Sequence, residues 1–170
     1  MRAEFGHRQS KNRGQLIVES MIAITILIIG ILGVLSLLSQ SLGFYRVAYE
    51  EHVAVNLAAE GIEVVKNIID TNIVNGDRWN KGLAVAKDSF QVQYDSSNLD
   101  PVSNKPLNFD PATGIYSYDT LGFATNFKRE IIIENKLSDD EIQVNSIVTW
   151  KSRGGAGLSI NLEDHFYNWR

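Results

Sequence analysis

Cysteine is absent from this chain of 170 residues. That absence excludes a disulfide framework, a thiolate zinc site and a thiol nucleophile. Histidine is scarce as well, and His7, His52 and His165 do not combine with acids at metal-ligand spacing. No serine lies in the pattern that surrounds a hydrolase nucleophile. We therefore expect a protein that is not an enzyme and has no cofactor or metal, stabilised by packing or by assembly with partners.

Calcium binding by the acidic residues is an alternative to the expectation of no metal. Asp95, Asp100, Asp110 and residues 139–141 offer carboxylate oxygens, which are the ligands that calcium takes. The spacing of an EF-hand is absent, so the expectation of no metal is retained.

Proline is also scarce: the chain has three, and none precedes Pro101. A helix can therefore continue through the first part of the chain without a break. From Leu16 to Leu38, 23 successive residues are apolar or small apart from one acid, Glu19. At about 1.5 Å per residue, a helix of this length crosses a hydrocarbon core about 30 Å thick. The run predicts a transmembrane helix with a carboxylate near one end.

Charge is unevenly distributed along the chain. The first 14 residues have a net charge of +3, and because the whole chain carries −4, the remainder carries −7. An acidic body argues against nucleic-acid binding. The positive-inside rule places residues 1–14 in the cytoplasm and the body outside. A signal peptide cleaved near residues 39–41 is an alternative, but the apolar region of a signal peptide is only about 7–15 residues long.

The helical pattern continues beyond the membrane run. Apolar residues recur at i, i+3, i+4 and i+7, which predicts an amphipathic helix. They are Val47, Ala54, Leu57, Ala58, Gly61, Ile62, Val65, Ile68 and Ile69. Ala54, Ala58 and Gly61 are small, which predicts close packing against a sheet of the same chain. One helix is therefore expected from about Gln15 to about Thr71, where turn residues end it.

Beyond the helix, apolar and polar residues alternate, which is typical of half-buried strands. Strands are predicted at residues 90–94, 127–134, 141–150 and 158–162, with a weaker one at 115–120 and a hairpin turn at 153–156. Residues 95–114 are rich in Pro, Asn and Asp, which predicts a long surface loop. The predicted fold class is α+β, a long N-terminal helix packed on an antiparallel sheet of about four strands. The predicted parts are a leader at 1–14, a membrane half of the helix at 15–43, its outer half at 44–72 and a β domain at 73–170.

The start of the apolar run resembles a known family signature. Arg13 and Gly14, followed by Gln15, Glu19 and the apolar helix, resemble the signature of type IV prepilins. In that family a membrane peptidase cuts after the glycine of a short basic leader and methylates the new amine. The resemblance implies cleavage between Gly14 and Gln15, N-methylation of Gln15 and an assembly role for Glu19. It also implies the pilin-like fold of a long helix followed by an antiparallel sheet.

Two features depart from the family pattern. The first residue after the cut is usually apolar but is Gln15 here, and the mid-helix proline of many members is missing. Gly30 and Gly33 remain as weak points of the helix. Residues 54–72 resemble, more loosely, minor pilins of the pilus-modification type (PilV-like).

The resemblance implies a structural subunit, a minor pilin. Its partners would be the prepilin peptidase, other pilin subunits through the apolar helix, the assembly platform and the membrane, with no nucleic acid. It would first be a single-pass protein of the cytoplasmic membrane, N-terminus inside, and later part of an extracellular pilus or periplasmic pseudopilus. One alternative is a pseudopilin of a type II secretion or DNA-uptake system. An alternative of another class is a signal-anchored membrane protein that keeps its leader and carries an external binding domain.

Overall fold

The computed structural model describes residues 9–83, 87–120, 122–135 and 140–168, and of residues 9–13 the backbone alone. The chain divides into two compact units, Met1–Arg46 and Val47–Arg170. Most of the predicted leader, residues 1–8, lies outside the described residues.

A single helix, α1 (Gln9–Val74), accounts for all the described residues of the first unit and begins the second. It begins earlier than the expected start at Gln15. The physical reason is that nothing between Gln9 and Gly14 stops a helix, since one glycine costs only about 1 kcal/mol and no proline is present. The long uninterrupted helix that the sequence predicts is therefore present.

The C-terminus of α1 is closed by a Schellman motif. Gly76 has a φ of 75°, which favours glycine, and its N–H donates to the carbonyl of Ile73 at 3.1 Å. The N–H of Asp77 donates to the carbonyl of Asn72 at 2.9 Å. The Asn72 side chain also donates to the carbonyl of Lys81 at 2.9 Å. The two backbone bonds satisfy carbonyls of the last helical turn, and the Asn72 side chain ties the helix end to the segment that follows it.

The larger sheet has five strands. They are β1 (Asp88–Gln91), β2 (Asp100–Pro101), β6 (Lys128–Asn135), β7 (Glu141–Lys151) and β8 (Gly157–Tyr167). Their order is β2-β1-β6-β7-β8, and each neighbouring pair is antiparallel. The α+β class is confirmed, with one strand more than the predicted four.

A second, smaller sheet was not predicted. Its strands are β3 (Asn108–Asp110), β4 (Ile115–Ser117) and β5 (Phe123–Ala124), in the order β4-β3-β5. The prediction of one loop at 95–114 is therefore wrong, because β2 and β3 lie within it. The weaker strand predicted at 115–120 is present as β4, whereas β2, β3 and β5 have only two or three residues and are too short to show the alternation from which strands are predicted.

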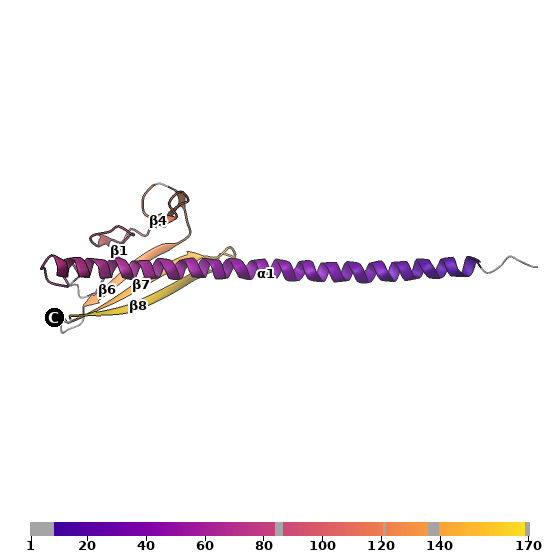
Figure 1. Cartoon of the computed structure of the whole chain (residues 1–170), viewed down its shortest axis with the longest axis horizontal. Helices are drawn as coiled ribbons and strands as arrows, with labels where there is room; N and C mark the ends of the chain where they lie inside the picture. Colours follow the sequence, from indigo (N-terminus) through magenta and orange to yellow (C-terminus); the bar gives the residue numbers. More distant parts are fainter. Residues whose placement is uncertain (1–8, 84–86, 121, 136–139, 169–170) are drawn as a thin grey trace, which may run out of the picture. The chain divides into compact units, whose positions relative to one another are not determined.

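The core of the second unit lies between α1 and one face of the larger sheet, and Figure 1 shows β6, β7 and β8 beside this part of the helix. Every second residue of β7 from Ile142 to Trp150 is buried. The fully buried apolar residues include Ala54, Ala58, Val65, Leu83, Leu107, Ile131, Ile133, Ile142, Val144 and Val148. The amphipathic pattern of residues 54–69 thus meets the alternating pattern of the strands.

Aromatic rings attach the small sheet to this core. The ring centroids of Phe127 and Trp150 are 6.0 Å apart, and those of Tyr116 and Phe127 are 6.4 Å apart in an edge-on arrangement. Phe109 and Tyr116 follow at 4.9 Å. This chain of rings places β3 and β4 beside the end of the larger sheet where β6 begins and β7 ends.

Candidate functional site

The first unit consists of an apolar helix with no core of its own. Every side chain described between Gly14 and Arg46 is exposed within the chain. One 18-residue window of α1 has a mean hydropathy of 2.9, and none of that window is buried. By length and composition, this part of α1 fits a single-pass transmembrane anchor.

Gly14, Gln15 and Glu19 lie on this helix. Gln15 and Glu19 are four residues apart and line one shallow concavity with Val18 and Ile22, so they share a helix face. Among the described residues, Glu19 has neither a hydrogen-bond nor an ion-pair partner. Ser20, by contrast, donates to the carbonyl of Leu16 at 2.7 Å. The carboxylate is therefore a polar group that this chain's described residues leave unsatisfied.

The four glycines that the structure describes in the first unit are not required by the fold. A Cβ added at Gly14, Gly30, Gly33 or Gly43 would meet no atom within 4 Å. None of these residues has a positive φ. Neither packing within the chain nor backbone conformation therefore explains glycine at these positions.

Ala54, Ala58 and Gly61 lie on the face of α1 that covers the sheet. Ala54 and Ala58 are fully buried. A Cβ on Gly61 would lie 2.5 Å from Ser146 Oγ and 2.8 Å from Ile131 Cδ1, closer than real contacts allow. The three small residues let the helix backbone approach β6 and β7.

Sequence reasoning missed a buried arginine at this contact. The side chain of Arg129 on β6 has no exposed surface. Its Nη1 donates to the carbonyl of Leu57 at 2.9 Å and to Glu60 Oε1 at 3.0 Å. Its Nη2 donates to the carbonyl of Val92 at 2.6 Å. Glu60 is not part of the apolar stripe of the helix, yet its carboxylate reaches Arg129 on the sheet.

The inward position of Arg129 could have been predicted from the alternation of apolar residues in the sequence. Phe127, Ile131 and Ile133 alternate around it and point inward, so an inward position is predicted for residue 129 as well. A charge at such a position requires a partner. The partner could not be named, because Glu60 lies 69 residues away along the chain.

His165 lies between two carboxylates on the larger sheet. Its Nδ1 is 2.6 Å from Glu141 Oε1, and its Nε2 is 3.0 Å from Glu163 Oε1. Hydrogen bonds to Glu163 first and Glu141 second raise the pKa of His165 above its ordinary value of 6.5. Bonds from Asn145 and then His165 lower the pKa of the Glu163 carboxyl. His165, Glu141 and Glu163 thus form a partly exposed ion-pair cluster across β7 and β8.

The residues considered for calcium do not form a site together. Asp110 closes its own turn, accepting from the Ala112 N–H and the Thr113 hydroxyl, both at 2.9 Å. Asp139 lies outside the described residues. Within the described ranges, no group of three or more His, Asp or Glu side chains could hold a metal ion.

Comparison with known proteins identifies no relative of this chain. No family model, no curated protein and no solved structure matches the chain.

Proposed function

We propose that this chain is a structural subunit of a type IV pilus or related filament, a minor pilin processed after Gly14. The observation that carries the proposal is Glu19, an acid on an apolar helix with no partner among the described residues. A charge placed in lipid without a partner costs about 2.5–3.5 kcal/mol on insertion scales. Such an acid calls for a partner from outside the described contacts of the chain.

Cleavage after Gly14 would create that partner. The new α-amine on Gln15 is a cation four residues before Glu19, on the same helix face. The amine of one subunit can pair with its own Glu19 or with that of a neighbour. A bundle that buries the paired charges is tolerated, whereas a bundle that buries the acid alone is not. The pair therefore favours correct register during assembly.

Gly14 supports the same proposal. Glycine inside a helix costs about 1 kcal/mol relative to alanine, and no contact or φ within the fold requires it here. A peptidase that accepts only a residue without a side chain before the scissile bond accounts for it. Gly30, Gly33 and Gly43 would similarly allow close approach of neighbouring helices.

The residues after the apolar run support a membrane position for this helix. Phe44 and Tyr45 are 74% and 70% exposed and lie six and seven residues after the run ends at Leu38. Aromatic residues are enriched at the level of the lipid headgroups. With the basic leader on the cytoplasmic side, these two rings would mark the outer interface.

Two alternatives compete with this proposal. A pseudopilin of a secretion or DNA-uptake system would share the processing and differ in the filament that it joins. A signal-anchored protein with an external binding domain would share the membrane helix and keep residues 1–14.

The deciding experiment measures the N-terminus of the mature protein. The chain is expressed in a host that has a prepilin peptidase, extracted from membranes and analysed by intact mass. We expect a chain that begins at Gln15. Gly14→Leu should retain Met1, whereas Gly30→Leu, a matched change on the same exposed helix, should be cleaved normally. A wild-type chain that still begins at Met1 would contradict the proposal and favour the signal-anchored protein.

A further inference from the structure

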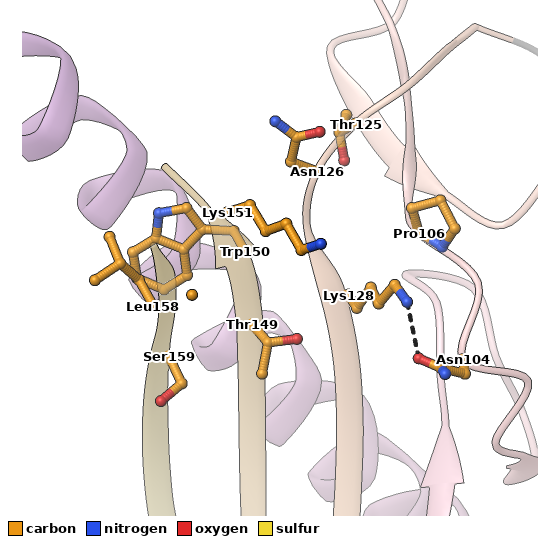
Figure 2. A pocket seen from close by; sticks show the side chains of 11 residues that line it. Asn104, Pro106, Thr125, Asn126, Lys128, Thr149, Trp150, Lys151, Leu158 and Ser159 are labelled. Carbon is orange, nitrogen blue, oxygen red and sulfur yellow. Dashed lines mark hydrogen bonds between the residues drawn. The ribbon is translucent and has the colours of Figure 1, made fainter. Parts of the chain in front are cut away.

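A groove lies on the larger sheet at the end where β6 begins and β7 ends. Its volume is about 630 Å³, within the range of small-molecule sites. Eleven residues line it, and Figure 2 shows their side chains. They are Asn104, Pro106, Thr125, Asn126, Lys128, Thr149, Trp150, Lys151, Gly157, Leu158 and Ser159.

The strand register brings its polar groups together. Lys128 on β6 is directly opposite Thr149 on β7, which is opposite Ser159 on β8. Lys151 lies two residues beyond Thr149, and both alternate with the buried Trp150, so they project from the face opposite α1. The residue opposite Lys151 is Gly157, which has no side chain to fill the groove.

The groove is positively charged within an acidic chain. None of its lining residues is acidic, although the chain has 20 acids against 16 bases. Neither Lys128 nor Lys151 forms an ion pair with any residue in the described ranges. Figure 2 shows the Lys128 ammonium beside Asn104 and the Lys151 ammonium directed toward the chain that leads into β6. Two unpaired cations on one side of a groove attract an anionic group.

One of the two ammonium groups is held in place. Lys128 Nζ donates to Asn104 Oδ1 at 3.0 Å. Asn104 has a φ of 53°, the one positive φ of a non-glycine residue within the described ranges. Asparagine adopts this left-handed conformation more readily than most other non-glycine residues. An ammonium positioned by a neutral amide keeps its charge available to a ligand.

The remaining groups narrow the chemical class of that ligand. Thr149 and Ser159 supply hydroxyls, and Asn126 supplies an amide, all of which donate and accept hydrogen bonds. Pro106 supplies apolar surface in the same groove, whereas the Leu158 side chain packs into the core beside Trp150. A ligand that matches this lining has one carboxylate, several hydroxyls and an apolar face.

We propose that this groove binds an acidic sugar, a pyranose ring that carries a carboxylate, as in a uronic-acid polymer. Lys128 and Lys151 pair with the carboxylate. Thr149, Ser159 and Asn126 bond the ring hydroxyls. The inference goes beyond the proposed filament role and does not depend on it, because binding concerns the unassembled chain.

Isothermal titration calorimetry of the full chain in phosphatidylcholine nanodiscs tests the proposal, with trigalacturonate as the probe. We expect saturable binding that weakens as salt rises. Lys128→Gln and Lys151→Gln should each weaken it at least tenfold. Lys66→Gln is the matched control, because Lys66 is an exposed lysine of the same unit that lies 3.7 Å from Glu63, away from the groove. It should leave the affinity within twofold of wild type.

The proposal can also be tested by changing the ligand and keeping the wild-type protein. A folding defect in a protein variant then cannot affect the result. The methyl ester of trigalacturonate has the same shape without the charge and should bind wild type at least tenfold more weakly. Inorganic sulfate should also bind at least tenfold more weakly, because it lacks hydroxyls. No saturable binding, equal binding of the ester, or equal binding of sulfate would each overturn the proposal.

Discussion

Arg129 holds together three segments that are distant in the sequence. Its guanidinium bonds the helix at Leu57 and Glu60 and the chain after β1 at Val92. Five rigid donors suit arginine to such multiple contacts better than lysine. Its own carbonyl accepts from the Tyr118 hydroxyl at 3.1 Å, which adds the segment after β4. The residue is thus a structural centre of the second unit.

Removing Arg129 should therefore be costly. Arg129→Ala would leave the Val92 carbonyl and the Glu60 carboxylate without their donor. We expect a loss of about 3–5 kcal/mol in the free energy of unfolding. Denaturation by urea of the full chain in nonionic micelles, followed by tryptophan fluorescence, measures it. Glu60→Gln keeps an acceptor for Nη1 and should cost less than Arg129→Ala; an equal loss would show that the ion pair, and not the backbone bonds, dominates.

The raised pKa of His165 makes the stability of the second unit depend on pH, and the direction of this dependence can be predicted. Because its pKa is raised on folding, its stabilising effect is fully present below the unfolded value of 6.5 and is lost as pH rises through the folded value. The pKa of Glu163 is lowered, so its contribution is present above 4.5 and is lost as pH falls through its folded value. NMR titration of His165 should give a midpoint above 6.5. The melting temperature of His165→Gln should lack the wild-type decline on the alkaline side, and an unchanged decline would assign it to other groups.

The helix and the longest strands could be predicted from the sequence because their patterns extend over many residues. The stripe from Ala54 to Ile69 and the alternation in β7 both indicate buried faces, and each is several periods long. The short strands β2, β3 and β5 could not be predicted, because two or three residues show no period. The contact between Glu60 and Arg129 could not be predicted, because Glu60 is not part of the apolar stripe and Arg129 lies 69 residues further along the chain. The groove could not be predicted, because strand register brings Lys128, Thr149 and Ser159 into one row.

The contact between α1 and the sheet can be tested at adjacent alanines. Ala58 is fully buried, whereas Ala59 is exposed on the same turn. Ala58→Leu should overpack the contact and cost about 1–3 kcal/mol. Ala59→Leu adds the same atoms at an exposed position and should change the free energy of unfolding by less than about 0.5 kcal/mol. Urea denaturation of both variants of the full chain measures the difference; equal values would show that Ala58 tolerates a larger side chain.

The two units of the chain differ in whether their apolar side chains are buried. The second unit buries its apolar residues between α1 and the larger sheet. The first unit leaves its apolar side chains exposed, among them Ile22, Leu27 and Leu35, so a membrane or neighbouring helices must cover them. Folding of the second unit and assembly through the first are therefore expected to respond to different substitutions.

Glu19→Ala tests this separation. Glu19 has no partner among the described residues, so its removal should leave the folding, cleavage and membrane insertion of the full chain intact. Incorporation into purified filaments should fall, because the charge that fixes the register is lost. Immunoblotting of sheared filaments against whole cells measures the incorporated fraction. Glu51→Ala, which removes an exposed acid beyond the apolar run, is the control and should be incorporated normally. Normal incorporation of Glu19→Ala would contradict the pairing argument.

Gln15, the first residue of the chain after the proposed cleavage, provides the sharpest test of that argument. An N-terminal glutamine can cyclise on its own amine, which releases ammonia and removes the positive charge. A cyclised Gln15 could not neutralise Glu19, and the acid would enter the bundle unpaired at a cost of several kcal/mol. We therefore expect assembled chains to keep an open, cationic amine, methylated as the resemblance to prepilins implies. Peptide mass spectrometry distinguishes the forms, because cyclisation lowers the mass by about 17 Da and one methyl group raises it by about 14 Da. Cyclised Gln15 should be enriched in the unassembled membrane pool relative to filaments. A filament pool in which most chains are cyclised would mean that Glu19 enters protonated or pairs elsewhere, and the proposed role of the amine would be wrong.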